Sequence, residues 1–251
     1  MKLMKIRFLT ALFLFLTFVA ETDAANVYFD VSHRVIFQPD SDKKLGLKKF
    51  VSLFENNGAR VHIKAPDFNA TGAARPDLLV LPGSMTEYSA REIDRIEKFV
   101  KEGGSLLVLL HIAPPLARVT ERFGIVLSNA VISETENLID GQSQDFYARH
   151  ISPHPVTEGV SSVALYGTWG LLPEKGAQVV AATGDNAYPD FNRNRVRDKN
   201  EPKVKVGVVA VSEFGKGKVV VVADDAPLAN AFLAMGDNLK LATNIVSWLT
   251  E

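Results

Sequence analysis

The stretch EIDRIEKFVKEGGSLLVLLHIAPP, residues 92–115, decides the fold class. Its first half carries apolar residues at helical spacing, namely Ile93, Ile96, Phe99 and Val100, behind a capping box formed by Ser89 and Glu92. After two glycines that end the helix, residues 106–110 are apolar throughout, which is typical of a strand buried on both faces. A helix followed at once by such a strand predicts an α/β protein.

The segments on either side repeat this alternation. Strands are expected over 26–33, 60–66, 76–84, 126–132, 177–183, 204–214 and 216–225, and a helix over 45–59. FGKGK at 214–218 predicts a tight turn and hence an antiparallel C-terminal hairpin. The polar stretch 133–160 is interpreted as a long surface excursion. We expect a mostly parallel, doubly wound (flavodoxin-like) sheet with helices on both faces. The last helix, within 236–249, should turn inward Leu239, Ala242, Ile245, Val246 and Leu249.

The N-terminal residues predict export. Lys2, Lys5 and Arg7 precede an uncharged apolar run at 8–20, and TDAA at 22–25 offers small residues for cleavage. Residues 1–25 are therefore interpreted as a signal peptide, and residues 26–251 as a single periplasmic or secreted domain. The apolar run is shorter than the roughly 20 residues of a membrane helix, so no integral span is expected after cleavage.

Composition excludes several functions. The 251 residues are 47% hydrophobic and 23% charged with a net charge of -1, so no electrostatic field favours nucleic acid as a partner. The chain contains no cysteine. Disulfides, thiolate metal sites and a cysteine nucleophile are thereby excluded.

Candidate site residues stand at the ends of four of the expected strands. Asp30 and His33 lie at the end of 26–33, Gly83 and Ser84 at the end of 76–84, His111 directly after 106–110, and Asp224 with Asp225 at the end of 216–225. Because ligands bind where parallel strands end, we treat His111, Asp30, His33 and Asp224 as candidate catalytic residues, and Gly83, Ser84, His111 and Asp225 as candidate ligand-binding residues. A strand-end hydrogen bond for His111, a capping role for Ser84 and loop hydrogen bonds for the aspartates are the structural alternatives.

DFNRNRVRDKNE at 190–201 has the oxygen spacing of a calcium loop. Side-chain oxygens at positions one, three, five, nine and twelve, with the carbonyl at seven, would come from Asp190, Asn192, Asn194, Asp198, Glu201 and Val196. Arg195 stands where such loops need glycine, and three arginines add positive charge. The alternative is an exposed polar loop. Calcium, in a structural role, is the one cofactor that the sequence suggests.

Several stretches in succession carry a family resemblance: YFDVSH, DLLVLPGS, EIDRIEKFVKEGGSLLVLLH, SPHPVTEGV and GKGKVVVVADDAPLANAFLAMGDNLKLATNIVSWL. The chain resembles the class I glutamine amidotransferase-like superfamily. Within it, the chain is similar to the non-catalytic exported branch, with its gliding-motility and intraflagellar-transport-type domains, and more distantly to ThuA-like proteins. Active members of the superfamily place a cysteine after the strand that here ends at His111.

The resemblance without the nucleophile implies an exported, non-enzymatic binding or assembly module. Its partner would be a protein of the cell envelope or a small polar ligand. The alternative is a ThuA-like hydrolase or sugar-modifying enzyme using His111 with Asp30, His33 or Asp224. A third idea, calcium-supported carbohydrate binding, needs exposed Trp169, Tyr166 and Tyr188 as stacking platforms.

Overall fold

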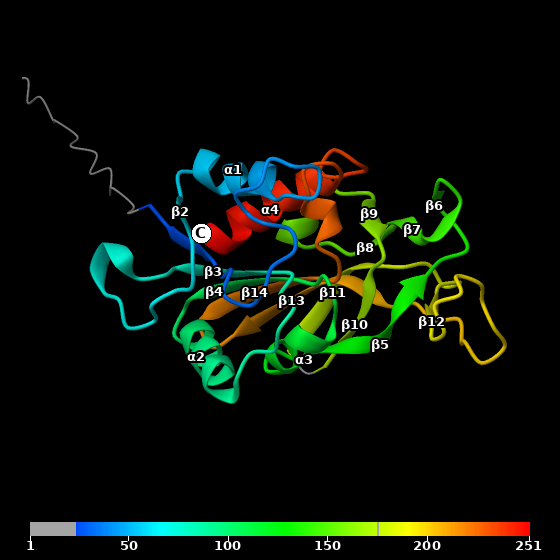
Figure 1. Ribbon diagram of the computed structural model, residues 1–251, viewed down its shortest axis with the longest axis horizontal. Helices are drawn as coiled ribbons and strands as arrows, with labels where there is room; N and C mark the ends of the chain where they lie inside the picture. Colours follow the sequence, from blue (N-terminus) through cyan, green and yellow to red (C-terminus); the bar gives the residue numbers. More distant parts are fainter. Residues whose placement is uncertain (1–23, 175) are drawn as a thin grey trace, which may run out of the picture.

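The structure is a computed structural model that describes residues 24–174 and 176–251 (Figure 1). The predicted signal peptide lies outside the described residues except for Ala24 and Ala25. None of the helices described is long and apolar enough to cross a membrane.

A parallel sheet forms the core of the molecule. Its strand order, β2-β1-β3-β4-β14, is that of the flavodoxin-like folds. All residues of β3 and β4 are buried, because helices cover both faces of this sheet. The strands are β1 (Asn26–Phe29), β2 (Arg60–Ile63), β3 (Leu78–Pro82), β4 (Ser105–Leu109) and β14 (Gly217–Val222).

The helices lie on both faces of the sheet, as Figure 1 shows. On one face α1 packs against α4, and on the other lie α2 and α3. The predicted capping box is confirmed: Ser89 and Glu92 bond reciprocally at the start of α2. The helices are α1 (Lys48–Asn56), α2 (Ala90–Lys101), α3 (Pro114–Glu121) and α4 (Asn238–Thr250), with 3-10 turns at η1 (Gly72–Ala74), η2 (Pro155–Thr157) and η3 (Ala226–Leu228).

Antiparallel strands extend the core to eleven strands. The expected hairpin is confirmed, since β13 pairs with β14 and Phe214 lies opposite Gly217. Beyond β13 the order continues through β10 and β5 to β12, while β11 and β8 branch from β13. Their bounds are β5 (Ile125–Ser133), β8 (His150–Ile151), β10 (Trp169–Pro173), β11 (Ala177–Ala182), β12 (Tyr188–Asp190) and β13 (Gly207–Phe214). The predicted fold class is thus confirmed, with a larger antiparallel part than the sequence indicated.

The interpretation of residues 133–160 as a surface excursion was wrong. They contribute β6 (Leu138–Ile139) and β7 (Gln142–Ala148), which form a small second sheet with β9 (Val163–Tyr166). In β7 alternate residues Phe146 and Ala148 are fully buried. The apolar alternation covers only three residues, which is too short a signal to stand out from the polar residues around it.

The predicted inward face of α4 is confirmed at four positions, Ala242, Ile245, Val246 and Leu249, and was wrong at Leu239. Leu239 is 47% exposed, whereas Leu241 is fully buried. Asn238 is the buried residue of the first turn and Leu241 follows it at i+3, so Leu239 lies one step round the helix from the buried face.

Replacing these two leucines by alanine tests the orientation of α4. Leu241→Ala should lower the free energy of unfolding by about 2–5 kcal/mol because it leaves a cavity in the core. Leu239→Ala, the matched control, should change it by less than about 0.5 kcal/mol. Urea denaturation measures both values, and equal losses would contradict the orientation described.

Candidate functional site

His111 and Asp225 form the centre of the candidate site. The imidazole Nδ1 lies 3.1 Å from both carboxylate oxygens of Asp225. Because a carboxylate only accepts, Nδ1 carries the proton and donates it. The side chain of Asp225 is 2% exposed and that of His111 is 29% exposed, so the imidazole is the part of this pair that solvent reaches.

Gly83 makes room for this pair. It has a φ of +64°, and a Cβ built on it would lie 2.4 Å from Oδ2 of Asp225 and 3.0 Å from Cβ of His111. Glycine is therefore needed for the conformation and for the close approach. The ends of β3, β4 and β14 meet here, as the sequence predicted for Gly83, His111 and Asp225.

Asp224 lies behind the pair and faces the protein interior. Its Oδ2 accepts the N–H of Tyr166 at 2.6 Å and its Oδ1 accepts the N–H of Ala226 at 2.9 Å. Burial, and then the neighbouring Asp225, raise the pKa of Asp224 to about 8. The hydrogen bond to Asp225 raises the pKa of His111. Asp224 therefore holds the last residue of β9 to the turn that follows β14.

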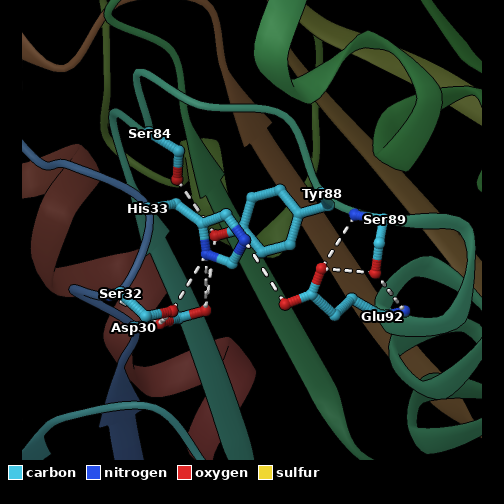
Figure 2. A network of polar contacts seen from close by, with 7 residues as sticks. All are labelled: Asp30, Ser32, His33, Ser84, Tyr88, Ser89 and Glu92. Atoms are coloured by element: carbon cyan, nitrogen blue, oxygen red, sulfur yellow. Dashed lines mark hydrogen bonds and ion pairs between the residues drawn. The ribbon is translucent and has the colours of Figure 1, made fainter.

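Asp30 and His33 belong to a second network, shown in Figure 2. Oδ1 of Asp30 accepts both the N–H and the hydroxyl of Ser32, at 2.9 and 2.5 Å. His33 lies between two carboxylates, with Nδ1 3.5 Å from Asp30 and Nε2 3.4 Å from Glu92. Its ring stacks on Tyr88 at 3.7 Å between centroids.

Tyr88 connects Ser84 to the same network. The Tyr88 hydroxyl lies 3.0 Å from the Ser84 hydroxyl and donates to Asp30 at 3.4 Å. Burial and the Asp30 carboxylate raise the pKa of Tyr88 well above its ordinary value, so the phenol stays protonated. Ser84 itself is fully buried, and it is held in a structural network rather than presented to a substrate.

The structure therefore divides the predicted site residues into two groups. Gly83, His111, Asp224 and Asp225 come together at one group of strand ends, and Asp30, His33 and Ser84 at the other. Across residues 24–174 and 176–251, no hydrogen bond or ion pair joins Asp30 or His33 to His111.

Sequence reasoning missed three contributors. Glu92 was interpreted only as a cap residue, but one of its oxygens also reaches His33. Tyr88 gave no signal beyond being an aromatic residue before a helix. Phe37 packs its ring edge to face against His111 at 5.1 Å, from a loop that no sequence pattern connects to β4.

The loop of residues 31–47 crosses the carboxyl ends of the strands at this edge of the sheet. Its residue Val35 forms an isolated antiparallel β-bridge with Ser84. Asn230 fixes the loop, because its side-chain amide donates to the carbonyls of Ser41 and Lys43 at 2.9 and 2.7 Å. Val35 and Phe37 are each 6% exposed, so these two loop residues pack beside the site as part of the core.

The predicted calcium loop forms a compact turn built on two buried carboxylates. Asp190 accepts the backbone N–H groups of Asn194 and Arg195, at 3.1 and 2.9 Å. Glu201 accepts those of Phe191 and Asp198, at 2.9 and 2.8 Å. Arg195 has a φ of +63°, at the position where calcium loops usually have glycine.

The other predicted ligands mainly contact one another. The side-chain amides of Asn192 and Asn194 donate to Asp198 at 2.6 and 3.0 Å, and Asn194 also accepts the N–H of Val196. In the part of the chain that the structure describes, no three His, Asp or Glu side chains converge to hold a metal ion. Calcium here would depend on amide and carbonyl oxygens in addition to carboxylates, and it stays a prediction.

The aromatic residues of the carbohydrate idea are not stacking platforms. Trp169 and Tyr188 are 6% and 2% exposed, and the half-buried Tyr166 stacks on Phe232 at 4.0 Å. The indole N–H of Trp169 donates to the carbonyl of His111 at 3.4 Å. Trp169 therefore packs behind the site, whereas Tyr188 is buried in β12 beside the 190–201 loop.

This parallel core, with its antiparallel extension and a histidine at the end of β4, is a class I glutamine amidotransferase-like fold. The chain has no cysteine, so the thiol on which that class of amidotransferase depends is absent. The chain belongs to the family described as Domain of unknown function (DUF4350), whose model matches residues 39–246. No match is found among curated proteins.

Solved structures share this fold at low sequence identity. The mmIFT52 N-terminal domain matches with a TM-score of 0.72 and 15% identity, over 90% of this chain and 97% of that one. The β-galactosidase from Rahnella sp. R3 matches with 0.50 and 16%, over 90% of this chain and 30% of that one. A putative ThuA-like protein from Bacteroides uniformis matches with 0.44 and 14%, over 88% and 89%. The first two likenesses, with TM-scores of 0.72 and 0.50, establish the fold alone.

The buried carboxyl of Asp224 predicts how stability depends on pH. Its folded pKa of about 8 exceeds that of the unfolded chain, so between about pH 5 and 8 the folded state alone keeps the proton. The free energy of unfolding should therefore fall with rising pH, by up to about 1.4 kcal/mol per unit. The raised pKa of His111 acts in the same direction, since its contribution is present at low pH and is lost as the imidazole deprotonates.

Urea denaturation at several pH values measures this slope. Asp224→Asn should make the slope shallower because the titrating group is gone. A slope that is the same in wild type and variant would contradict the assignment.

Calorimetric titration tests the calcium prediction. Calcium added to purified residues 26–251 should give a binding isotherm of weak to moderate affinity that Asp190→Ala abolishes. Because Asp190 also holds the backbone of the loop, Asp198→Asn serves as a milder second variant. Absence of binding heat with the wild-type chain would end the prediction.

Proposed function

We propose that this chain is an exported, non-enzymatic binding or assembly module, whose partner is a protein of the cell envelope or a small polar ligand. One observation carries the proposal. Where the amidotransferases have a thiol, the chain has His111, and its imidazole is bound to the buried carboxylate of Asp225. The imidazole serves as a strand-end anchor and has no nucleophile beside it.

The burial and the hydrogen bonding of the other candidate residues support this function. Asp30, His33, Ser84 and Asp224 are each less than one-tenth exposed. Each makes hydrogen bonds or ion pairs within the protein. A catalytic site needs groups that can reach a reacting atom, whereas these groups satisfy one another.

The loop of residues 31–47 gives a second argument. Moving this loop away from the strand ends would require breaking the Asn230 hydrogen bonds and exposing Val35 and Phe37 to water. Exposing two such apolar side chains costs roughly 1.5–3 kcal/mol each. The loop is therefore stable in this position, and solvent reaches the His111–Asp225 pair through the imidazole.

A hydrolase or sugar-modifying enzyme remains the second candidate because of one observation. Both His111 and Asp224 have raised pKa values, and perturbed titratable groups gather at catalytic sites. The partners this candidate needs are divided between two networks, since Asp30 and His33 contact Tyr88 and Glu92 instead. The likeness to the ThuA-like structure is too weak to add support.

Affinity purification of the mature chain from solubilised envelope fractions tests the module function. We expect a defined partner that untagged chain displaces in competition, and that His111→Ala still recovers. Purified protein should also be assayed against ester and glycoside substrates, with His111→Ala as the matched variant. Turnover that His111→Ala abolishes, while its melting temperature stays close to that of the wild type, would overturn the proposal in favour of the enzyme.

A further inference from the structure

An apolar groove lies in the antiparallel part of the large sheet, toward the edge formed by β5 and β12. It has a volume of about 350 Å³, and Ile132, Pro189 and Val206 are its buried members. Leu172 and Phe191 also line it and are 43% and 47% exposed. Bulky apolar side chains with that exposure mark an interaction surface when they gather in one groove.

The loop that follows β12 adds positive charge beside the groove. Phe191 belongs to both, because it lines the groove and begins residues 191–200, which project from the sheet in Figure 1. Arg193, Arg195, Arg197 and Lys199 are exposed there. The three carboxylates within residues 190–201 are less exposed: Asp190 and Glu201 are buried, and Asp198 is half-buried. Within the described residues, Arg193 and Arg197 form no ion pair.

The backbone of this loop is held in place. Asp190 and Glu201 together bind four of its N–H groups, and Arg195 reaches back to the side chain of Gln142 at 3.2 Å. The hydroxyl of Tyr188 donates to the carbonyl of Arg195 at 3.3 Å. A loop that is ordered before binding loses little conformational entropy on binding. Contacts to its cationic side chains therefore carry a small entropic penalty.

We propose that the groove and this loop together form a docking surface for an acidic protein segment that carries a bulky apolar side chain. The apolar side chain would enter the groove between Leu172 and Phe191, and its Asp or Glu neighbours would pair with Arg193 and Arg197. This inference rests on the module function proposed above and names the chemistry of its partner.

Charge selects this partner over a second copy of the chain. A two-fold contact through this surface would set the same arginines against themselves, and like charges repel. An acidic segment instead gains charge-assisted hydrogen bonds to guanidinium groups that have no ion-pair partner.

Selection from a random peptide library displayed on phage tests the surface, with the purified mature chain as target. We expect enriched peptides that combine a bulky apolar residue with Asp or Glu. Leu172→Asp should weaken their binding at least about tenfold, and Arg193→Gln with Arg197→Gln should weaken it and flatten its dependence on salt. The matched control is Leu239→Asp, at an exposed position of α4 outside the groove. This variant should bind the peptides as the wild type does.

Other results would overturn the proposal. These are enriched peptides without acidic residues, binding that both groove and arginine variants leave unchanged, or no enrichment at all. A dimer in sedimentation that Leu172→Asp dissociates would assign the groove to a second copy, and adsorption to phosphatidylglycerol vesicles in place of peptides would assign it to a membrane surface. An envelope partner recovered equally by wild type and Leu172→Asp would preserve the module function and reject only this surface.

Discussion

The buried carboxylate of Asp225 is the constraint around which the edge of the sheet is built. A carboxylate that is 2% exposed must be paired, and here His111 pairs with it from the neighbouring strand end. The pair fits only because Gly83, at the end of the next strand, has no side chain. The carboxyl ends of β3, β4 and β14 are thus held together by the His111–Asp225 ion pair, which fits against the bare backbone of Gly83. The ring of Phe37 packs against the imidazole of His111.

The sequence predicted the core because the physical signal there is local. Apolar runs over 78–82 and 106–109, a capped helix between them and a Gly-Lys turn at 215–216 each specify their structure without distant partners. The small sheet containing β7 could not be predicted in this way. Its polar residues gain their strand conformation from pairing with β9, a contact that no local pattern reveals.

The sequence indicated which residues lie at the candidate site, but it did not indicate which of them contact one another. Polar residues directly after apolar strands indicated Gly83, His111 and Asp225, since parallel strands end at one edge. Which of them touch depends on strand order and side-chain direction. Asp30 and His33 turned to Tyr88 and Glu92 because α2 begins beside them, and the sequence gives no measure of that distance.

The pairing of β4 with β14 has a consequence for how the chain folds. Leu106 lies opposite Val219, and every strand from β5 to β13 is inserted between them in the sequence. Until the last segment has emerged from the ribosome, the N-terminal half carries an apolar strand edge with no neighbour to cover it. The domain therefore closes late, and its N-terminal half is the part that a holding chaperone would encounter unfolded.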